Sequence, residues 1–369
     1  MLIGICGSLC SGKKTVAQYL VEHHGFKRLY LGSDSRGINS VGVKAAGESA
    51  DSDSTAPGRH PSKSLVGRGR HESHTFDTAE ALLEFVTLSW RSRFVTTDIP
   101  TEKVLDVFLR RPFFMLISTD APLLVRWRRH TTRAGETASV SADETGPAPA
   151  PLSLEAFAAE NDTHLYCPQR GLQPLIARAT VRLVNTSPSL AHLYATLGKL
   201  DVPNPERLRP GWDTYFMSLA SLAAQRSNCM KRRVGCVLVG EGRRVVSTGY
   251  NGTPRGLRNC ADGGCPRCNS GNSSGVGLAT CLCIHAEENA LLEAGRERIR
   301  AGCVLYCDTC PCLTCSIKIC QVGISEVVYA HGYSMDTETA AVFRQAGVKL
   351  RQFTPPPNGL IHLEKMDLY

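Results

Sequence analysis

Residues 281–320 read CLCIHAEENALLEAGRERIRAGCVLYCDTCPCLTCSIKIC, and the interpretation of the whole chain starts from this stretch. It contains an H-x-E motif at His285 to Glu287 and a P-C-x-x-C motif that ends at Cys315. A catalytic zinc site needs three protein ligands and one position left open for water. His285, Cys312 and Cys315 would supply the three ligands, and Glu287 stands two residues from the histidine, where its carboxylate can reach that water.

A purely structural zinc knot made of the same cysteine and histidine side chains is the alternative interpretation. It explains neither Glu287 nor the proline before Cys312. Both motifs are expected to open helices, where the positive end of the helix dipole favours thiolate over thiol. We therefore predict a catalytic zinc site at which Glu287 transfers protons.

The composition indicates a soluble globular protein of two domains. The chain has 369 residues, of which 42% are hydrophobic and 21% charged. Of its 16 cysteines, 13 lie at or after Cys229, a clustering that indicates metal ligation in a reducing compartment. The start of the chain does not resemble a signal peptide, and the apolar runs are too short to span a membrane. We therefore expect a cytoplasmic protein with no membrane partner, while a nuclear location stays open.

The net charge of +8 favours anionic partners, which include nucleotide phosphates. No dense stripe of Lys and Arg interleaved with aromatic residues is visible in the sequence, so a nucleic-acid surface is not indicated.

The N-terminal half begins with a phosphate-loop pattern. An apolar run at residues 2–6 leads into a loop bracketed by Gly7 and Gly12, which is followed by Lys13 and Thr15. In a strand–loop–helix setting Lys13 would reach phosphates and Thr15 could contact Mg²⁺. The spacing G-x-x-x-x-G-K-x-T resembles the phosphate loop of nucleoside monophosphate kinases. With further strands expected near 92–98 and 112–119, it predicts a P-loop kinase-like parallel α/β domain, or a domain that has kept this fold without kinase activity.

Changes in composition divide the chain. Two segments, about 33–75 and 134–152, are poor in large apolar side chains and are expected to be disordered insertions. Residues 201–210 read as a proline-rich linker. The full division is a first domain at 1–200, the linker, a second domain at 211–353 and a C-terminal tail at 354–369.

The second domain alternates helices and strands. A helix that begins near residue 212 precedes two β-rich runs, 234–239 and 245–250, which indicate a hairpin. Further strands are expected at 303–307, 326–330 and 348–353, with helices between them. The pattern predicts a mixed five-stranded sheet with helices on both faces.

The HAEENA and PCLTC motifs, with GYNGTP at 249–254 upstream, resemble those of the deoxycytidylate (dCMP) deaminases, which belong to the zinc-dependent cytidine/deoxycytidylate deaminase family. The likeness covers about residues 211–353, and the kinase-like half joined to it resembles the fungal form. The resemblance implies a cytidine-deaminase-like αβα sandwich that converts dCMP to dUMP and ammonia for thymidylate synthesis. It also implies a homo-oligomer, a hexamer in the family, activated by dCTP and inhibited by dTTP, with Mg²⁺ accompanying the effector.

Three further residues are candidate substrate contacts. Asn251 either contacts the sugar and phosphate through its amide or simply forms a turn with Gly252, and the nearby zinc motifs favour the contact. Asn289, one helical turn from His285, is either a substrate contact or a buried amide with its hydrogen bonds satisfied. Tyr329, at the end of an expected strand, is a weaker candidate.

Six cysteines around a Gly/Ser-rich loop suggest a second, structural zinc site. Thiols at this density would be at risk of oxidation if left free, and a zinc ion would keep the loop ordered. Related phage deaminases carry a second zinc at positions that match Cys229, Cys260 and Cys283. We expect four of the six to bind the metal, although ordinary buried thiols are the alternative; the six are Cys229, Cys260, Cys265, Cys268, Cys281 and Cys283.

Two other functions share part of this evidence. One is deamination of a base in RNA, as in tRNA adenosine deaminases, and the other is a nucleotide-sensing protein with an inactive deaminase fold. The complete ligand set together with Glu287 argues against an inactive site.

Overall fold

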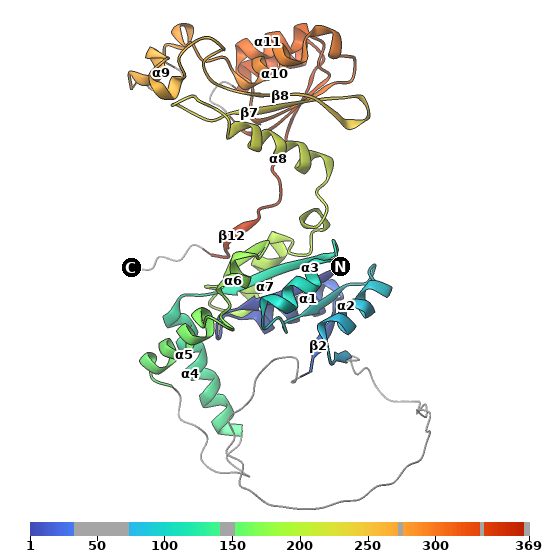
Figure 1. Cartoon of the computed structure of the whole chain (residues 1–369), viewed down its shortest axis with the longest axis vertical. Coiled ribbons are helices and arrows are strands. Elements are labelled where there is room, and N and C mark those ends of the chain that lie inside the picture. Colours follow the sequence, from blue (N-terminus) through green and yellow to red (C-terminus); the bar gives the residue numbers. More distant parts are fainter. Residues whose placement is uncertain (33–73, 141–151, 272–275, 333–335, 365–369) are drawn as a thin grey trace, which may run out of the picture. The chain divides into compact units, whose positions relative to one another are not determined.

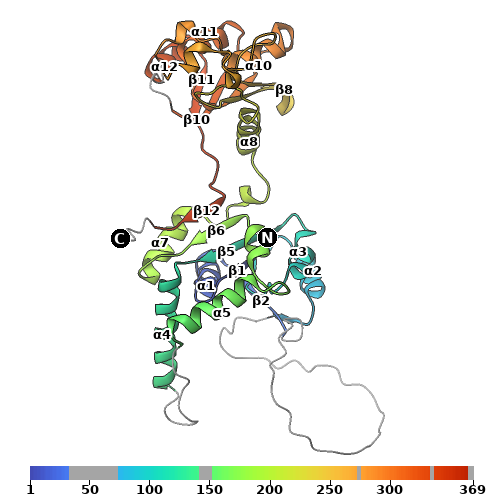
Figure 2. The same cartoon turned by 60° about the vertical axis from the view of Figure 1, so that its left-hand side comes forward.

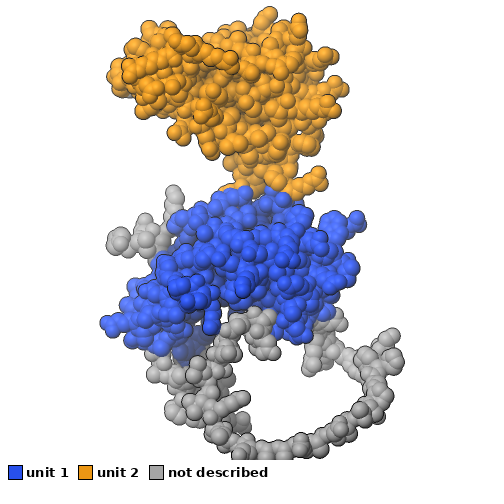
Figure 3. All heavy atoms as spheres, in the orientation of Figure 1, with its two compact units in different colours: residues 1–208, 358–369 blue, residues 209–357 orange. Residues whose placement is uncertain are grey.

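The computed structural model describes residues 1–32, 74–140, 152–271, 276–332 and 336–364. Most of both expected insertions, 33–73 and 141–151, lies outside the described residues. The chain forms two compact units, shown in different colours in Figure 3. Unit 1 contains residues 1–208 together with the C-terminal segment from Asn358, and unit 2 contains residues 209–357.

Unit 1 is a parallel α/β fold, as the strand–loop–helix pattern predicts. Its seven strands lie in the order β12-β6-β5-β1-β4-β2-β3, and every neighbouring pair is parallel. The helices pack around this sheet (Figure 1). The strands are β1 (Leu2–Gly7), β2 (Lys27–Leu31), β3 (His74–Phe76), β4 (Phe94–Thr96), β5 (Phe114–Asp120), β6 (Val181–Val184) and β12 (Gly359–His362). The helices are α1 (Lys13–His24), α2 (Ala79–Leu88), α3 (Glu102–Leu109), α4 (Leu123–Val140), α5 (Leu154–Tyr166), α6 (Gln173–Ala177) and α7 (Leu190–Leu200).

The central strands of this sheet are buried on both faces, which explains their continuous apolar sequences. Leu2 packs into the core on one face, whereas Ile3 and Ile5 pack into the core on the other. Residues 134–140 were expected to belong to a disordered insertion, but they form the C-terminal part of α4.

The structure corrects two of the expected boundaries. Residues 354–369 were expected to be a tail, but Gly359–His362 form β12, which pairs in parallel with β6. Leu363, which follows the strand, is buried in the core of unit 1. The expected linker 201–210 is ordered and belongs to unit 1 up to Leu208. Within it Arg207 is buried, and its Nη1 donates to Asn358 Oδ1 at 2.8 Å.

Unit 2 contains the predicted mixed sheet, and this prediction is confirmed. The strand order is β11-β10-β9-β7-β8. β7 is antiparallel to both of its neighbours, and the remaining pairs are parallel. The strands are β7 (Gly235–Gly240), β8 (Arg244–Tyr250), β9 (Val304–Thr309), β10 (Glu326–His331) and β11 (Lys349–Gln352). The helices are α8 (Trp212–Ala224), α9 (Pro266–Asn269), α10 (Ala286–Ala294), α11 (Leu313–Gln321) and α12 (Asp336–Gln345).

Helices cover both faces of this sheet because its strand residues alternate between two cores. Cys236 and Leu238 of β7 face the core formed with α10 and α11, whereas Val237 and Val239 face the core formed with α8. Figure 2 shows α10 and α11 on one side of the sheet and α8 on the other. The two helices that carry the H-x-E and P-C-x-x-C motifs therefore share one face.

Candidate active site and metal centres

The three predicted zinc ligands meet at the N-termini of two helices. His285 is the N-cap residue of α10 and Cys312 is the N-cap residue of α11, with Cys315 in the first turn of that helix. The Nδ1 atom of His285 lies 3.3 Å from Cys312 Sγ and 3.4 Å from Cys315 Sγ. Tetrahedral zinc with ordinary bond lengths separates a nitrogen and a sulfur ligand by about 3.6 Å. The donor set therefore fits a zinc ion bound through Nδ1.

The electrostatics of this group favour a charged thiolate. Hydrogen bonds from Cys315 and His285 lower the pKa of Cys312 to about 3. The hydrogen bond to Cys312 in turn raises the pKa of His285 to about 8. Zinc binds thiolate rather than thiol, so a cysteine that is already ionised is prepared for the metal.

Glu287 lies beside the three ligands on the first turn of α10. Its side chain is only 3% exposed, and burial raises its pKa to about 7. Among the described residues, none forms a hydrogen bond with its Oε2 atom. A buried carboxylate oxygen without a partner is costly unless a ligand or water completes the site. Its raised pKa also suits a group that both accepts and donates protons near neutral pH.

Contacts around the two helices hold this arrangement, and the sequence motifs do not reveal them. Lys318 of α11 forms a 2.7 Å ion pair with Glu288 of α10, which links the two helices. The buried Thr339 of α12 donates from Oγ1 to the carbonyl oxygen of Pro311 at 3.1 Å, just before Cys312. A single sequence does not show which residues of different helices will contact each other. Each of these side chains would also be compatible with a solvated helix surface.

Backbone packing brings α10 close to β8. Ser247 Oγ donates to the carbonyl oxygen of Ala290 at 2.7 Å. A Cβ atom at Gly249 would overlap the backbone oxygen of Ala286 and lie 2.5 Å from the nitrogen of Ala290. Only glycine permits this close approach, so Gly249 sets the position of the helix that carries Glu287.

The side chain of Asn251, which follows β8, is hydrogen-bonded to the loop between α8 and β7. Its side chain is buried, with Oδ1 accepting from the backbone N–H of Val234 at 2.8 Å and from Ser227 Oγ at 2.7 Å. Its Nδ2 donates to the carbonyl oxygen of Arg232 at 2.8 Å. Both ends of the amide are thus used by the loop, and the substrate contact expected for Asn251 stays a prediction.

Asn289 and Tyr329 also stay predictions as substrate contacts. Asn289 Nδ2 donates to the carbonyl oxygen of Tyr250 at 2.9 Å, which joins α10 to the end of β8. Tyr329 is partly buried in β10 and pairs with Cys307 in the sheet.

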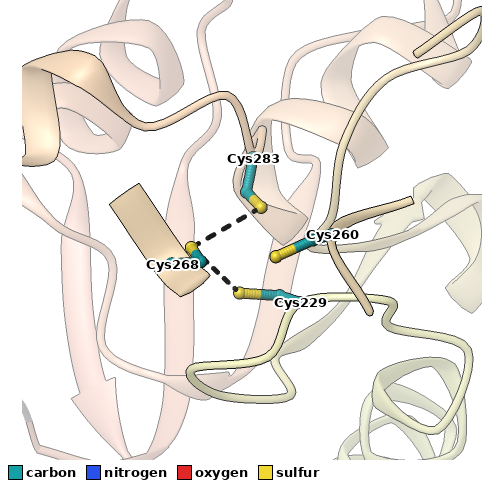
Figure 4. Close-up of side chains that lie close together, drawn as sticks. All are labelled: Cys229, Cys260, Cys268 and Cys283. Atoms are coloured by element: carbon teal, nitrogen blue, oxygen red, sulfur yellow. Dashed lines mark hydrogen bonds between the residues drawn. The ribbon is translucent and has the colours of Figure 1, made fainter. Parts of the chain in front are cut away.

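All six cysteines expected near a second metal come together in unit 2. Figure 4 shows four of the thiol groups directed toward one another, from Cys229, Cys260, Cys268 and Cys283. Cys265 and Cys281 join the same cluster and form a second group of four with Cys268 and Cys283. None of the six forms a disulfide.

The expected phosphate loop lies between β1 and α1. Gly7 ends the strand, and Gly12 takes a left-handed conformation at φ +96° immediately before the helix. Lys13 Nζ donates to the carbonyl oxygen of Gly7 at 3.4 Å across the loop, and Thr15 is partly buried in the first turn of α1.

Comparisons with known proteins agree with this geometry. A family model described as the cytidine and deoxycytidylate deaminase zinc-binding region matches residues 210–331. The deoxycytidylate deaminase of Schizosaccharomyces pombe is 44% identical over 97% of this chain and 99% of its own length. The chain belongs to the deoxycytidylate deaminase family.

Other members of the family match part of the chain. The Saccharomyces cerevisiae enzyme is 46% identical over 75% of this chain and 86% of its own length. A solved dCMP deaminase of cyanophage S-TIM5, in complex with dCMP and dUMP, is 31% identical over 38% of this chain and 94% of that one, with a TM-score of 0.32.

Within the described ranges, no helix combines the length and apolar character needed to cross a membrane.

Proposed function

We propose that this chain hydrolyses dCMP to dUMP and ammonia. The observation that carries the proposal is the buried Glu287 carboxylate, whose Oε2 has no partner among the described residues and which lies beside three side chains that fit zinc. Membership of the deoxycytidylate deaminase family supports dCMP as the substrate.

His285, Cys312 and Cys315 would hold the zinc ion. When bound there, zinc lowers the pKa of water at its open position to near 7. Glu287 takes a proton from the attacking water and passes it to N3 of the cytosine ring, while the water oxygen bonds to C4. Glu287 then takes the proton of the hydroxyl group now on C4 and delivers it to the amino group. The C4–N bond breaks, a carbonyl forms at C4, ammonia leaves, and the first proton stays on N3 of dUMP.

A substrate panel tests this assignment against deamination of RNA. We expect the purified, zinc-loaded protein to release ammonia from dCMP and to act more slowly on CMP, deoxycytidine, cytosine and tRNA. Release of ammonia can be followed directly, with zinc content measured on the same sample. If tRNA alone reacted, the proposed substrate would be wrong.

The N-terminal loop is proposed to bind the phosphates of a nucleotide, as a P-loop kinase-like domain would. Its support is the strand–loop–helix arrangement, with Gly12 at the N-terminus of α1 and Lys13 spanning the loop. By family resemblance, the nucleotide would be an effector, dCTP or dTTP with Mg²⁺, acting on a cytoplasmic homo-oligomer.

Removal of the Lys13 ammonium tests this loop. A charged hydrogen bond to phosphate contributes about 1.5–3 kcal/mol, so Lys13→Met should weaken nucleotide binding by about 10- to 100-fold. Calorimetric titration with dCTP–Mg²⁺ measures the change, and Lys27→Met, at an exposed position in β2, serves as the control. Unchanged affinity in Lys13→Met would place the effector elsewhere.

A further inference from the structure

The six-cysteine cluster contains two potential metal sites that share an edge. One group of four consists of Cys229, Cys260, Cys268 and Cys283, and the other of Cys265, Cys268, Cys281 and Cys283. In each group all sulfur atoms lie within 4.8 Å of one another. Cys268 and Cys283 belong to both groups.

The spacing of the sulfur atoms matches zinc coordination. Two thiolates on one tetrahedral zinc ion lie about 3.8 Å apart when the Zn–S bonds are about 2.3 Å. Cys268 Sγ lies 3.9 Å from Cys229 Sγ on one side of the cluster and 3.7 Å from Cys281 Sγ on the other. It also lies 3.9 Å from Cys283 Sγ, the other shared ligand. Disulfide sulfurs would be about 2.05 Å apart, so these contacts are not disulfides.

We propose that this cluster binds two zinc ions bridged by the thiolates of Cys268 and Cys283. The other four cysteines each bind one ion, so that each zinc has four sulfur ligands. Binding releases the six thiol protons to solvent and involves no change of oxidation state. This site is separate from the ligand set of His285, Cys312 and Cys315 and shares no residue with it.

A single zinc ion would satisfy only part of the cluster. In the first group it would leave Cys265 and Cys281 as closely packed thiols, 3.9 Å apart. In the second group it would leave Cys229 and Cys260. The sulfur atoms of each group lie within 4.8 Å of one another, and two ions use all six sulfurs.

Hydrogen bonds to sulfur support a charged thiolate in each group. The backbone N–H of Met230 donates to Cys260 Sγ at 3.4 Å. The backbone N–H of Leu282 donates to Cys265 Sγ, also at 3.4 Å. One donor therefore serves a non-bridging ligand of each proposed zinc ion, as expected if both ions are present.

The proposed cluster has a net charge of −2, and Arg267 lies beside it. Arg267 precedes the shared ligand Cys268 in α9, and its side chain is buried. Its Nε donates to the carbonyl oxygen of Val276 at 2.9 Å, which fixes the side chain. A buried cation in this place offsets the excess negative charge of the thiolates.

The cluster also fixes the chain that leads into the active site. Cys283 is two residues from His285, and the residue between them, Ile284, forms an antiparallel bridge with Gly252. A bridging metal ligand at Cys283 would hold this backbone at the entrance to α10.

Zinc analysis of the full-length protein tests the proposal. We expect three zinc ions per chain, of which one belongs to the active site. His285→Ala should lower the content by one and leave the cluster filled, which separates the two centres. Cys265→Ser should also lower the zinc content relative to wild type, whereas Cys167→Ser, a partly buried thiol of unit 1, should leave it unchanged. Two zinc ions per chain in the fully loaded wild-type protein would overturn the proposal, and so would an unchanged zinc content in Cys265→Ser.

A second measurement needs no cysteine variant and so does not depend on the variants folding. After exchange of the cluster metals for cadmium-113, two ions joined by bridging thiolates should give two resonances split by coupling between the cadmium nuclei. The splitting should remain in His285→Ala. A single unsplit cluster resonance from fully loaded protein would show one isolated metal ion and refute the bridge.

Discussion

Glu287→Gln is expected to abolish turnover while the protein keeps its active-site zinc. Glutamine has nearly the same volume as glutamate but cannot accept a proton from water. General acid–base groups contribute about 10²–10⁴-fold to rate, and Glu287 serves both proton transfers, so kcat should fall by about 10³-fold or more. Zinc content should not change, because the three ligands are other residues. The free energy of unfolding should not fall, since the buried amide carries no charge to desolvate.

Glu293→Gln is the matched control for this variant. Glu293 lies on the same helix, but its side chain is 60% exposed, and the substitution changes the charge of the chain by the same amount. Its kcat should stay within about twofold of wild type, as expected for a surface position. If Glu287→Gln retained comparable activity, the role assigned to this carboxyl group would be wrong.

Gly249→Ala should damage the site from a distance. The added methyl group would overlap the backbone of α10 at Ala286, one residue from His285 and Glu287. Overpacking of this kind costs about 1–3 kcal/mol in the free energy of unfolding. If the strain is relieved by a shift of α10, a displacement of about 1 Å at Glu287 would lower kcat by about 100-fold.

Urea unfolding and steady-state kinetics together measure this effect. Thr248→Ala is the control, because its side chain lies on the exposed face of the same strand. It should leave kcat unchanged and alter stability by less than about 1 kcal/mol. Wild-type kcat and stability in Gly249→Ala would show that the close approach of strand and helix does not position the catalytic carboxyl group.

The grouping of His285, Cys312 and Cys315 could be predicted from the sequence because these residues belong to two short motifs. His285 and Glu287 are two residues apart, and Cys312 and Cys315 are three residues apart. Each pair lies at the N-terminus of one helix. The mixed sheet of unit 2 was predicted correctly because its strands alternate regularly with helices.

Features that depend on distant contacts could not be predicted in this way. Strand β12 has only four residues and pairs with β6, which lies far away in sequence. The ion pair between Glu288 and Lys318 joins two helices that no local pattern connects. The division of the six cysteines into groups depends on how the loop folds back on itself, since spacing alone allows many combinations.

Because strand β12 belongs to the sheet of unit 1, unit 2 is a domain inserted into the sequence of unit 1. Unit 2 is the guest domain of this insertion and unit 1 is the host domain. The chain leaves unit 1 after Leu208 and returns to the same sheet from Asn358. A stop codon placed just after unit 2 would therefore remove a strand from the other fold and expose the edge of β6. An isolated host would need its two sequence pieces joined directly, whereas the guest could be excised as one continuous segment.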